Sequence, residues 1–153
     1  MAKGMASPFV IQELPGFTPR IGELVVMMDY VRHTTLMAVQ GLTTSQLDYL
    51  HDPQSNTIGT LLGHIAAVEI AYQVDTFEGR GLTPRERQGW GVLLDLGERA
   101  RREIRGRPLA YYLHLLKDVR QKTANNYFKW FHVFEDEINH RGQIRWLCKR
   151  LSR

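Results

Sequence analysis

Asp136 and His140 stand four residues apart and are the first pair in this sequence that could do chemistry together. Positions i and i+4 share one face of a helix. The same face holds the aliphatic residues Val133, Ile144, Leu147 and Leu151. A carboxylate among aliphatic side chains is costly to bury unless it is paired or bound to a metal ion. The pattern therefore allows two interpretations, a buried Asp–His hydrogen bond or part of a metal site.

His64 is a second histidine that is predicted to face inward, from another apolar helix. The residues about one turn away are small or aliphatic and carry no charge: Thr60, Leu61, Ala67, Val68 and Ala71. Small side chains let a neighbouring helix or a bound ion come close. The alternative is a core histidine hydrogen-bonded to a backbone carbonyl or a hydroxyl group, and helical periodicity alone does not bring the two helices together.

Other polar residues near these positions are given lesser roles. His132 lies one turn before Asp136, at the edge of the inward sector, where it could orient a ligand or face a substrate. Glu69 points about 140° away from His64, so we do not expect it to be a ligand. Glu137 is expected to flank the inward sector only loosely.

Cys148 and His33 are expected to have structural roles. Cys148 has no base beside it at helical spacing, which favours a buried or half-buried thiol. His33 follows Asp29 by one turn, which predicts an exposed or interface ion pair. A single cysteine cannot form an internal disulfide, so we expect a reducing, cytoplasmic compartment.

Four long segments with helical periodicity must position these residues, and none shows sustained strand alternation. They run from about residue 18 to 40, from after Asn56 to about 77, from Pro108 onward, and from about 126 to 151. The first has an inward stripe of Ile21, Leu24, Met28, Val31, Thr35 and Val39. Ser55 or Asn56 is expected to cap the second.

Short helices are expected in the connections. Two capping boxes, each a Thr followed three residues later by Gln or Glu, predict helices over 44–49 and from Pro84 onward. A further short helix is expected over 93–104. The elements together predict an all-α fold, a single four-helix bundle over residues 18–153 that follows a loosely ordered N-terminal extension, 1–17.

The composition is that of an ordinary globular protein, with 43% hydrophobic and 24% charged residues. No apolar run approaches the roughly 18 residues that a membrane span needs, so no membrane partner is expected.

The net charge is +4, but most basic residues alternate with acidic ones at helical spacing. The unbalanced basic residues near the C-terminus complement a helix dipole. We therefore expect no nucleic-acid partner.

Three stretches of this chain resemble the DinB / YfiT-like superfamily. They are 41–47, residues 55–69 around His64, and residues 132–144 around His140. The resemblance implies a four-helix bundle of up-down-down-up topology, often found as a homodimer. It also implies a divalent metal ion held by three histidines, at the positions of His64, Asp136 and His140.

Asp136 departs from the family pattern, which has histidine there. Aspartate remains a competent ligand, so the resemblance implies a site for zinc or nickel, with manganese or iron as further options. A second departure lies between Arg120 and Asn125, where relatives carry a longer segment.

Relatives in this superfamily include metal-dependent thiol S-transferases that use bacillithiol or mycothiol, and a maleylpyruvate isomerase. The resemblance therefore implies a transferase that joins a low-molecular-weight thiol to an electrophilic substrate, with His132 as a catalytic residue. The alternative is a non-catalytic helical dimer with a structural or vestigial metal site. A second apolar face of the last helix, formed by Phe131, Phe134 and Ile138, is either core or dimer interface.

Overall fold

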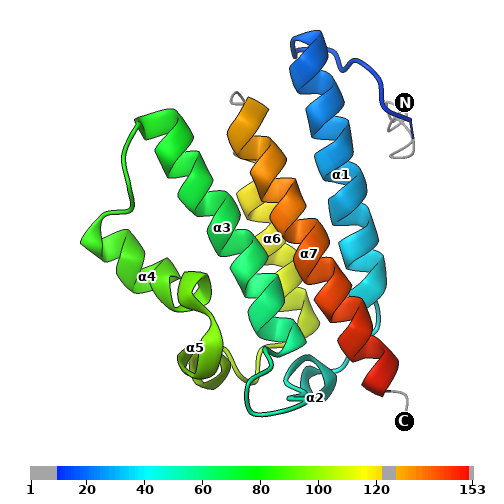
Figure 1. Ribbon diagram of the computed structural model, residues 1–153, viewed down its shortest axis with the longest axis vertical. Coiled ribbons are helices and arrows are strands. Elements are labelled where there is room, and N and C mark those ends of the chain that lie inside the picture. The colour runs from blue at the N-terminus through cyan, green and yellow to red at the C-terminus, as the bar shows by residue number, and fades with distance from the viewer. Residues whose placement is uncertain (1–9, 122–126, 152–153) are drawn as a thin grey trace.

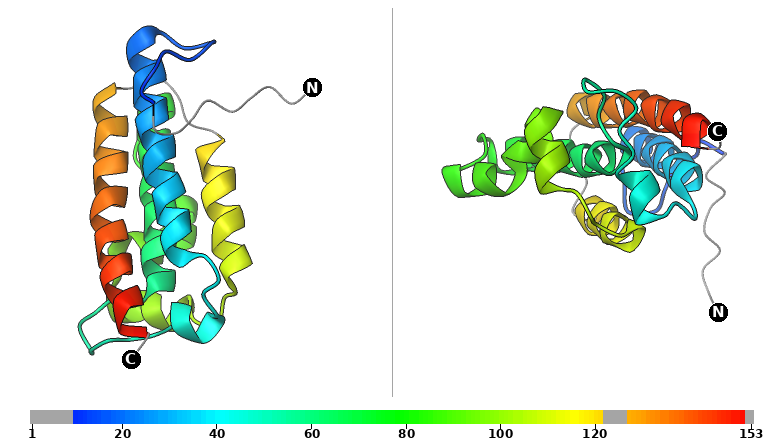
Figure 2. Two further views of the ribbon diagram at one scale, coloured as in Figure 1. Left: turned by 90° about the vertical axis from the view of Figure 1, so that its right-hand side faces the viewer. Right: turned by 90° about the horizontal axis from the view of Figure 1, so that it is seen from below.

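Four long helices form the bundle in the computed structural model, which describes residues 10–121 and 127–151. They are α1 (Pro19–Val39), α3 (Ile58–Glu78), α6 (Leu109–Arg120) and α7 (Tyr127–Leu151). Helices α1 and α7 run in one direction and α3 and α6 in the other, as Figures 1 and 2 show. The described residues contain helices and no strand, so the predicted all-α bundle and its up-down-down-up topology are confirmed.

Three shorter helices connect the long ones. They are α2 (Thr44–Leu47), α4 (Pro84–Asp95) and α5 (Gly97–Glu103). Both predicted capping boxes are present, at the starts of α2 and α4. In each box the Thr side chain accepts a hydrogen bond from the backbone N–H three residues later, and the Gln or Glu side chain accepts one from the backbone N–H of the Thr. These N–H groups have no acceptor within the helix.

The predicted cap of α3 was wrong. Thr57 caps this helix, and its hydroxyl accepts a hydrogen bond from the Thr60 N–H. The side chain of Asn56 is used elsewhere, because its Oδ1 accepts from the Gly97 N–H at 3.2 Å. Ser55 donates its hydroxyl to Asp52.

The predicted short helix over 93–104 is present as α5 but begins later, at Gly97, because the chain breaks between α4 and α5. Leu96 has a φ of 55° and Gly97 a φ of 74°, and both values leave the right-handed helical region. Leu93 therefore lies in the last turn of α4. The backbone carbonyls of a last turn receive no hydrogen bond from an N–H group of the same helix. The break leaves the Leu93 carbonyl free to accept from a side chain.

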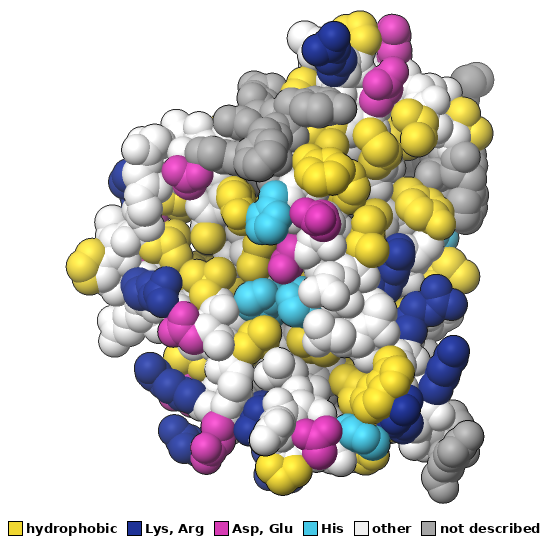
Figure 3. Space-filling model, viewed as in Figure 1, with side chains coloured by type: hydrophobic (Ala, Val, Ile, Leu, Met, Phe, Trp, Pro, Cys, Tyr) yellow, Lys and Arg dark blue, Asp and Glu magenta, His cyan; other side chains and the backbone are white. Residues whose placement is uncertain are grey.

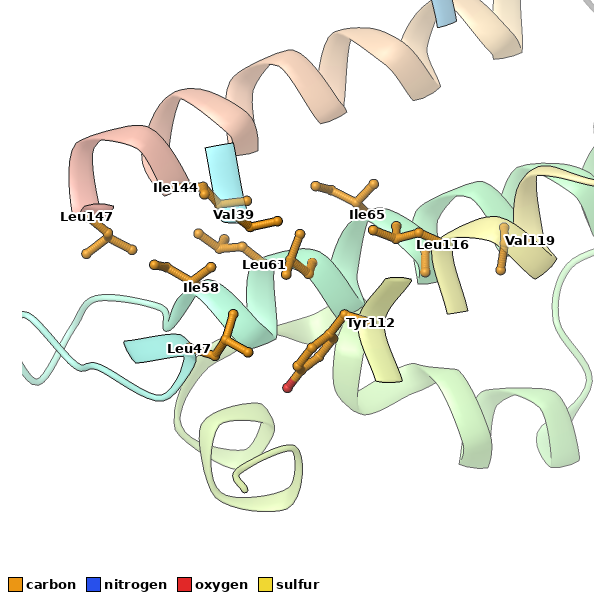
Figure 4. Packing of buried hydrophobic residues seen from close by; sticks show 12 residues of the cluster. Val39, Leu47, Ile58, Leu61, Ile65, Tyr112, Leu116, Val119, Ile144 and Leu147 are labelled. Carbon is orange, nitrogen blue, oxygen red and sulfur yellow. The ribbon is translucent and has the colours of Figure 1, made fainter. Parts of the chain in front are cut away.

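The main core lies where α3 meets α6 and α7, and Figure 4 shows its packing. Its largest fully buried members include Leu61, Ile65, Tyr112 and Ile144. A second cluster joins α1 to α7 through Leu24, Met28, Val31, Val133 and Phe134. Phe134 is thus core, whereas Phe131 and Ile138 stay exposed.

The remaining sequence predictions concern the ends and the connections. The predicted extension is described only from residue 10, and its Leu14 backbone packs against Gly22 of α1. The departure from relatives that is expected between Arg120 and Asn125 falls mostly in 122–126, outside the described residues. No described helix is both long and apolar enough to cross a membrane.

Candidate metal centre

His64, Asp136 and His140 meet between α3 and α7, two helices that pack directly against each other. One potential ligand atom from each residue lies within 4.8 Å of the other two. The two imidazole rings meet edge to face, with centroids 4.7 Å apart. In Figure 3, histidine and acidic side chains gather over these two helices near the middle of the face. The fold thus brings the predicted set together.

The distances fit a shared ion better than direct hydrogen bonds. Asp136 Oδ1 lies 3.4 Å from His140 Nε2, and Asp136 Oδ2 lies 3.9 Å from His64 Nε2. Ordinary hydrogen bonds of this type are shorter, at about 2.7–3.2 Å. Ligand atoms around a tetrahedral ion with bonds of about 2.1 Å stand about 3.4 Å apart.

Two buried polar atoms of this cluster have no hydrogen-bond partner among the described residues. They are Asp136 Oδ2 and His140 Nδ1. A buried polar atom without a partner costs about 1–3 kcal/mol. A ligand at this position would compensate the carboxylate, so the donor set of two imidazoles and one carboxylate fits a divalent metal ion.

The backbone of α4 orients His64. The ring Nδ1 lies 2.8 Å from the Leu93 carbonyl oxygen, to which it donates as Nδ1–H. That hydrogen bond leaves the lone pair on Nε2, the nitrogen that faces Asp136. Burial lowers the pKa of His64, although the Leu93 carbonyl opposes the shift. The imidazole is therefore neutral at physiological pH, as a ligand must be.

His132 lies on the same helix but outside this cluster. Its side chain is about half exposed, and its Nδ1 stands 3.3 Å from Glu135 Oε2. Its ring meets the Tyr72 ring edge to face, with centroids 5.5 Å apart. His132 is thus held by contacts from two sides, one from its own helix and one from α3.

Cys148 lies apart from the site, half-buried on α7. Its thiol donates to the Ala38 carbonyl at 3.4 Å, and burial raises its pKa. Both observations agree with the structural role expected from the sequence.

A buried network of four charged side chains is the feature that the sequence analysis missed. Arg32 of α1 contacts Glu137 of α7 and Glu69 of α3, each at 2.9 Å. Arg120 of α6 contacts Glu69 at 2.7 Å and Glu137 at 3.2 Å. Both carboxylates are fully buried, and one side chain from each long helix takes part.

One prediction fails because of this network. Glu137 was expected to flank the inward sector loosely, but it is buried and paired. Asp29 lies at the edge of the network, 3.5 Å from Arg120. For Arg32, burial opposes the charge, yet the carboxylates of Glu137 and Glu69 outweigh burial and raise the pKa of the guanidinium.

A sequence signal for the network exists. Each of three charged residues follows an inward aliphatic residue by four positions, as Arg32 follows Met28, Glu69 follows Ile65 and Glu137 follows Val133. Charges in the inward stripes of three different helices indicate a shared buried network, because a lone buried charge would be unstable.

Comparison with known proteins adds one finding. The sequence model of the family described as mycothiol S-transferase matches residues 23–124. The match spans about two thirds of the chain, from α1 through α6, and includes His64. A search of curated proteins gives no match.

Proposed function

Because this chain belongs to the mycothiol S-transferase family, whose members are DinB-like, we propose that it transfers a low-molecular-weight thiol to an electrophilic substrate. The observation that carries the proposal is the convergence of His64, Asp136 and His140 on one point between two helices. No observation favours the alternative, a non-catalytic helical dimer with a structural or vestigial metal site.

The proposed cofactor is one divalent metal ion, with zinc or nickel favoured over manganese or iron. His64 and His140 would supply nitrogen ligands and Asp136 an oxygen ligand. Three protein ligands would leave room for a further ligand, and the ion would supply Lewis-acid chemistry that lowers the pKa of a thiol.

The backbone and side-chain groups around the site have separate roles in the proposed reaction. The Leu93 carbonyl fixes the tautomer of His64, and the Asp136 carboxylate balances the positive charge of the ion. His132 would take the proton of the thiol through Nε2, because its Nδ1 faces Glu135. The thiol sulfur then bonds to the electrophilic carbon, and the leaving group departs with its bonding electron pair.

Substitution of Asp136 tests the site. Asp136→Asn keeps the shape but removes the charge, so affinity for Zn²⁺ and Ni²⁺ should fall sharply, and Asp136→His should restore it. Asp95→Asn is the matched control, because Asp95 is an exposed aspartate paired with Arg87. Isothermal titration and elemental analysis measure the metal, and an assay with mycothiol and a haloalkyl electrophile measures transfer.

Two outcomes of these measurements would contradict the proposal. A wild-type protein that binds neither metal removes the metal site. Equal affinity in the wild type and in Asp136→Asn removes Asp136 from the ligands. A loss of only about 10- to 100-fold in Asp136→Asn would assign it an orienting role instead.

We also propose that the protein is a homodimer in the cytoplasm. Phe131 and Ile138 remain 45% and 40% exposed on α7 and could be covered by a second copy. Light scattering should then give twice the 17.7 kDa of one chain, and Ile138→Lys should weaken association while Leu50→Lys does not. A concentration-independent monomer would refute the dimer.

The cytoplasm is proposed because a reducing compartment keeps the cosubstrate and Cys148 as thiols.

A further inference from the structure

The bend between α4 and α5 is the one place among the described residues where a residue other than glycine has a positive φ. Leu96 combines a φ of 55° with a ψ of −151°, a region that is almost confined to glycine because a Cβ is crowded there. Such a conformation persists only where the surrounding contacts fix it, and it occurs most often at functional sites. The bend is therefore a candidate functional element, and its contacts indicate its role.

Three hydrogen bonds hold the bend against the segment that leads into α3. The N–H of Gly97 donates to Asn56 Oδ1 at 3.2 Å. Arg101, one turn further along α5, donates to the carbonyl oxygens of Ser55 at 2.8 Å and Pro53 at 2.9 Å. The two segments are therefore fixed relative to each other.

Asn56 supplies the only side chain that the segment before α3 contributes to these three bonds. The other two acceptors are backbone carbonyls, which a residue of any type could provide. Because Thr57 caps α3, the amide of Asn56 is available for the bend. The type of side chain at position 56 therefore matters for the bend.

The bend sets the position of Leu93, which lies three residues before Leu96 in the last turn of α4. In Figure 1, α4 and α5 lie beside α3. The side chain of Leu93 is buried against α3 so closely that a Cβ added at Gly63 would lie 2.5 Å from its Cδ2. Its carbonyl oxygen lies 2.8 Å from Nδ1 of His64, the next residue of α3. A shift of the bend would therefore move the carbonyl that orients His64.

The position of this carbonyl decides which nitrogen of His64 carries the proton. Two acceptors compete for it, the Leu93 carbonyl at 2.8 Å from Nδ1 and the Asp136 carboxylate at 3.9 Å from Nε2. A carboxylate is the stronger acceptor, so a displaced carbonyl would let the proton move to Nε2. A protonated Nε2 has no lone pair for an ion. The tautomer that can act as a ligand therefore depends on a carbonyl held close to Nδ1.

We propose that Asn56 is a positioning residue for His64. By holding the strained bend at Leu96, it keeps the Leu93 carbonyl against Nδ1 of His64 and leaves Nε2 free to bind an ion. The proposal rests on the proposed metal-dependent function, because it treats His64 as a ligand. It adds a residue outside the metal centre on which the centre depends.

The first test observes the tautomer of His64 in the metal-free protein. Long-range proton–nitrogen correlation spectra are recorded at a pH at which the imidazole is neutral. We expect the Nδ1–H form in the wild type and a measurable share of the Nε2–H form in Asn56→Ala. Asn56→Asp keeps an oxygen acceptor for the Gly97 N–H and should restore the Nδ1–H form. Thr57→Ala is the matched control, because it removes the cap of α3 and leaves the bend intact.

Two outcomes of this test would refute the proposal. One is an unchanged Nδ1–H form in Asn56→Ala. The other is an equal change in Thr57→Ala, because any loosening of α3 would then be enough to move the proton.

Two further measurements decide the question if Asn56→Ala does not fold. Hydrogen exchange at the Gly97 N–H of the wild type should be slow, and exchange as fast as at an exposed loop amide would overturn the proposal. The double variant Asn56→Ala with Leu96→Gly should fold and regain the Nδ1–H form, because glycine adopts a positive φ without strain. Failure of Leu96→Gly to restore that form would also count against the proposal.

The second test measures affinity for Zn²⁺ by isothermal titration of the same variants. Loss of a group that orients a ligand costs about 10- to 100-fold in affinity, and Asn56 acts one step further away, so we expect about 10-fold in Asn56→Ala. Asn56→Asp and Thr57→Ala should stay close to the wild type.

The outcomes separate this proposal from the proposed function. If the wild type binds no Zn²⁺ but the tautomer of His64 still changes in Asn56→Ala, the metal-dependent function fails and the control of the tautomer stands. If the wild type binds Zn²⁺ and Asn56→Ala changes neither the tautomer nor the affinity, the role of Asn56 fails and the proposed function stands.

Discussion

Removing Arg32 should destabilise the bundle far more than removing an exposed arginine. Arg32→Met keeps the length of the side chain but takes a shared partner away from Glu69 and Glu137, both fully buried. Breaking a buried ion pair costs about 3–5 kcal/mol, because the remaining charge stays desolvated. Arg120 still contacts both carboxylates, so we expect the lower end, about 3 kcal/mol.

Thermal and urea denaturation followed by circular dichroism measure the effect. For a chain of 153 residues, about 3 kcal/mol corresponds to a fall in Tm of about 6–12 °C. Arg99→Met is the matched control, because the Arg99–Glu103 pair is exposed and screened by solvent, so its loss should hardly change the stability. Arg32→Met with Glu137→Gln should recover part of the loss. If Arg32→Met is no more harmful than Arg99→Met, the network does not stabilise the fold.

Three further predictions concern single residues. The raised pKa of Cys148 leaves little thiolate at pH 8, so the native protein should react with Ellman's reagent far more slowly than the urea-unfolded protein; equal rates would contradict its burial. A Cβ added at Gly59 would lie 2.5 Å from the hydroxyl of Tyr112, a core residue, so Gly59→Ala should lower the free energy of unfolding by about 1–3 kcal/mol in urea titrations. Thr57→Ala removes the cap of α3 and its bond to Thr60, which should cost about 0.5–2 kcal/mol, and Thr57→Ser should restore most of it.

Several features of this protein could be predicted from the sequence because they depend on short stretches of chain. Periodicity places the four long helices, and capping boxes place the starts of α2 and α4. The angular position of each residue around the helix axis puts Asp136 and His140 on the inward side of α7. The resemblance then adds His64 as the third member of the set.

Other features depend on contacts between helices, which periodicity cannot supply. A repeat of 3.6 residues gives the direction of a side chain around its own helix axis, but not the residue that it meets. The carbonyl that orients His64 comes from Leu93, and it is available only because the chain breaks at Leu96. No local pattern around His64 contains that information.

The buried charges also show which features the sequence predicts and which depend on packing between helices. Arg32, Glu69 and Glu137 each carry a sequence signal of a charge in an inward stripe, but only the packing of four helices identifies their partners. Phe134 likewise became core because α1 covers it, whereas Ile138, one turn later, stays exposed. The sequence determined which side chains turn inward, and the tertiary structure decided what they meet, because burial free energy depends on surfaces far apart in the chain.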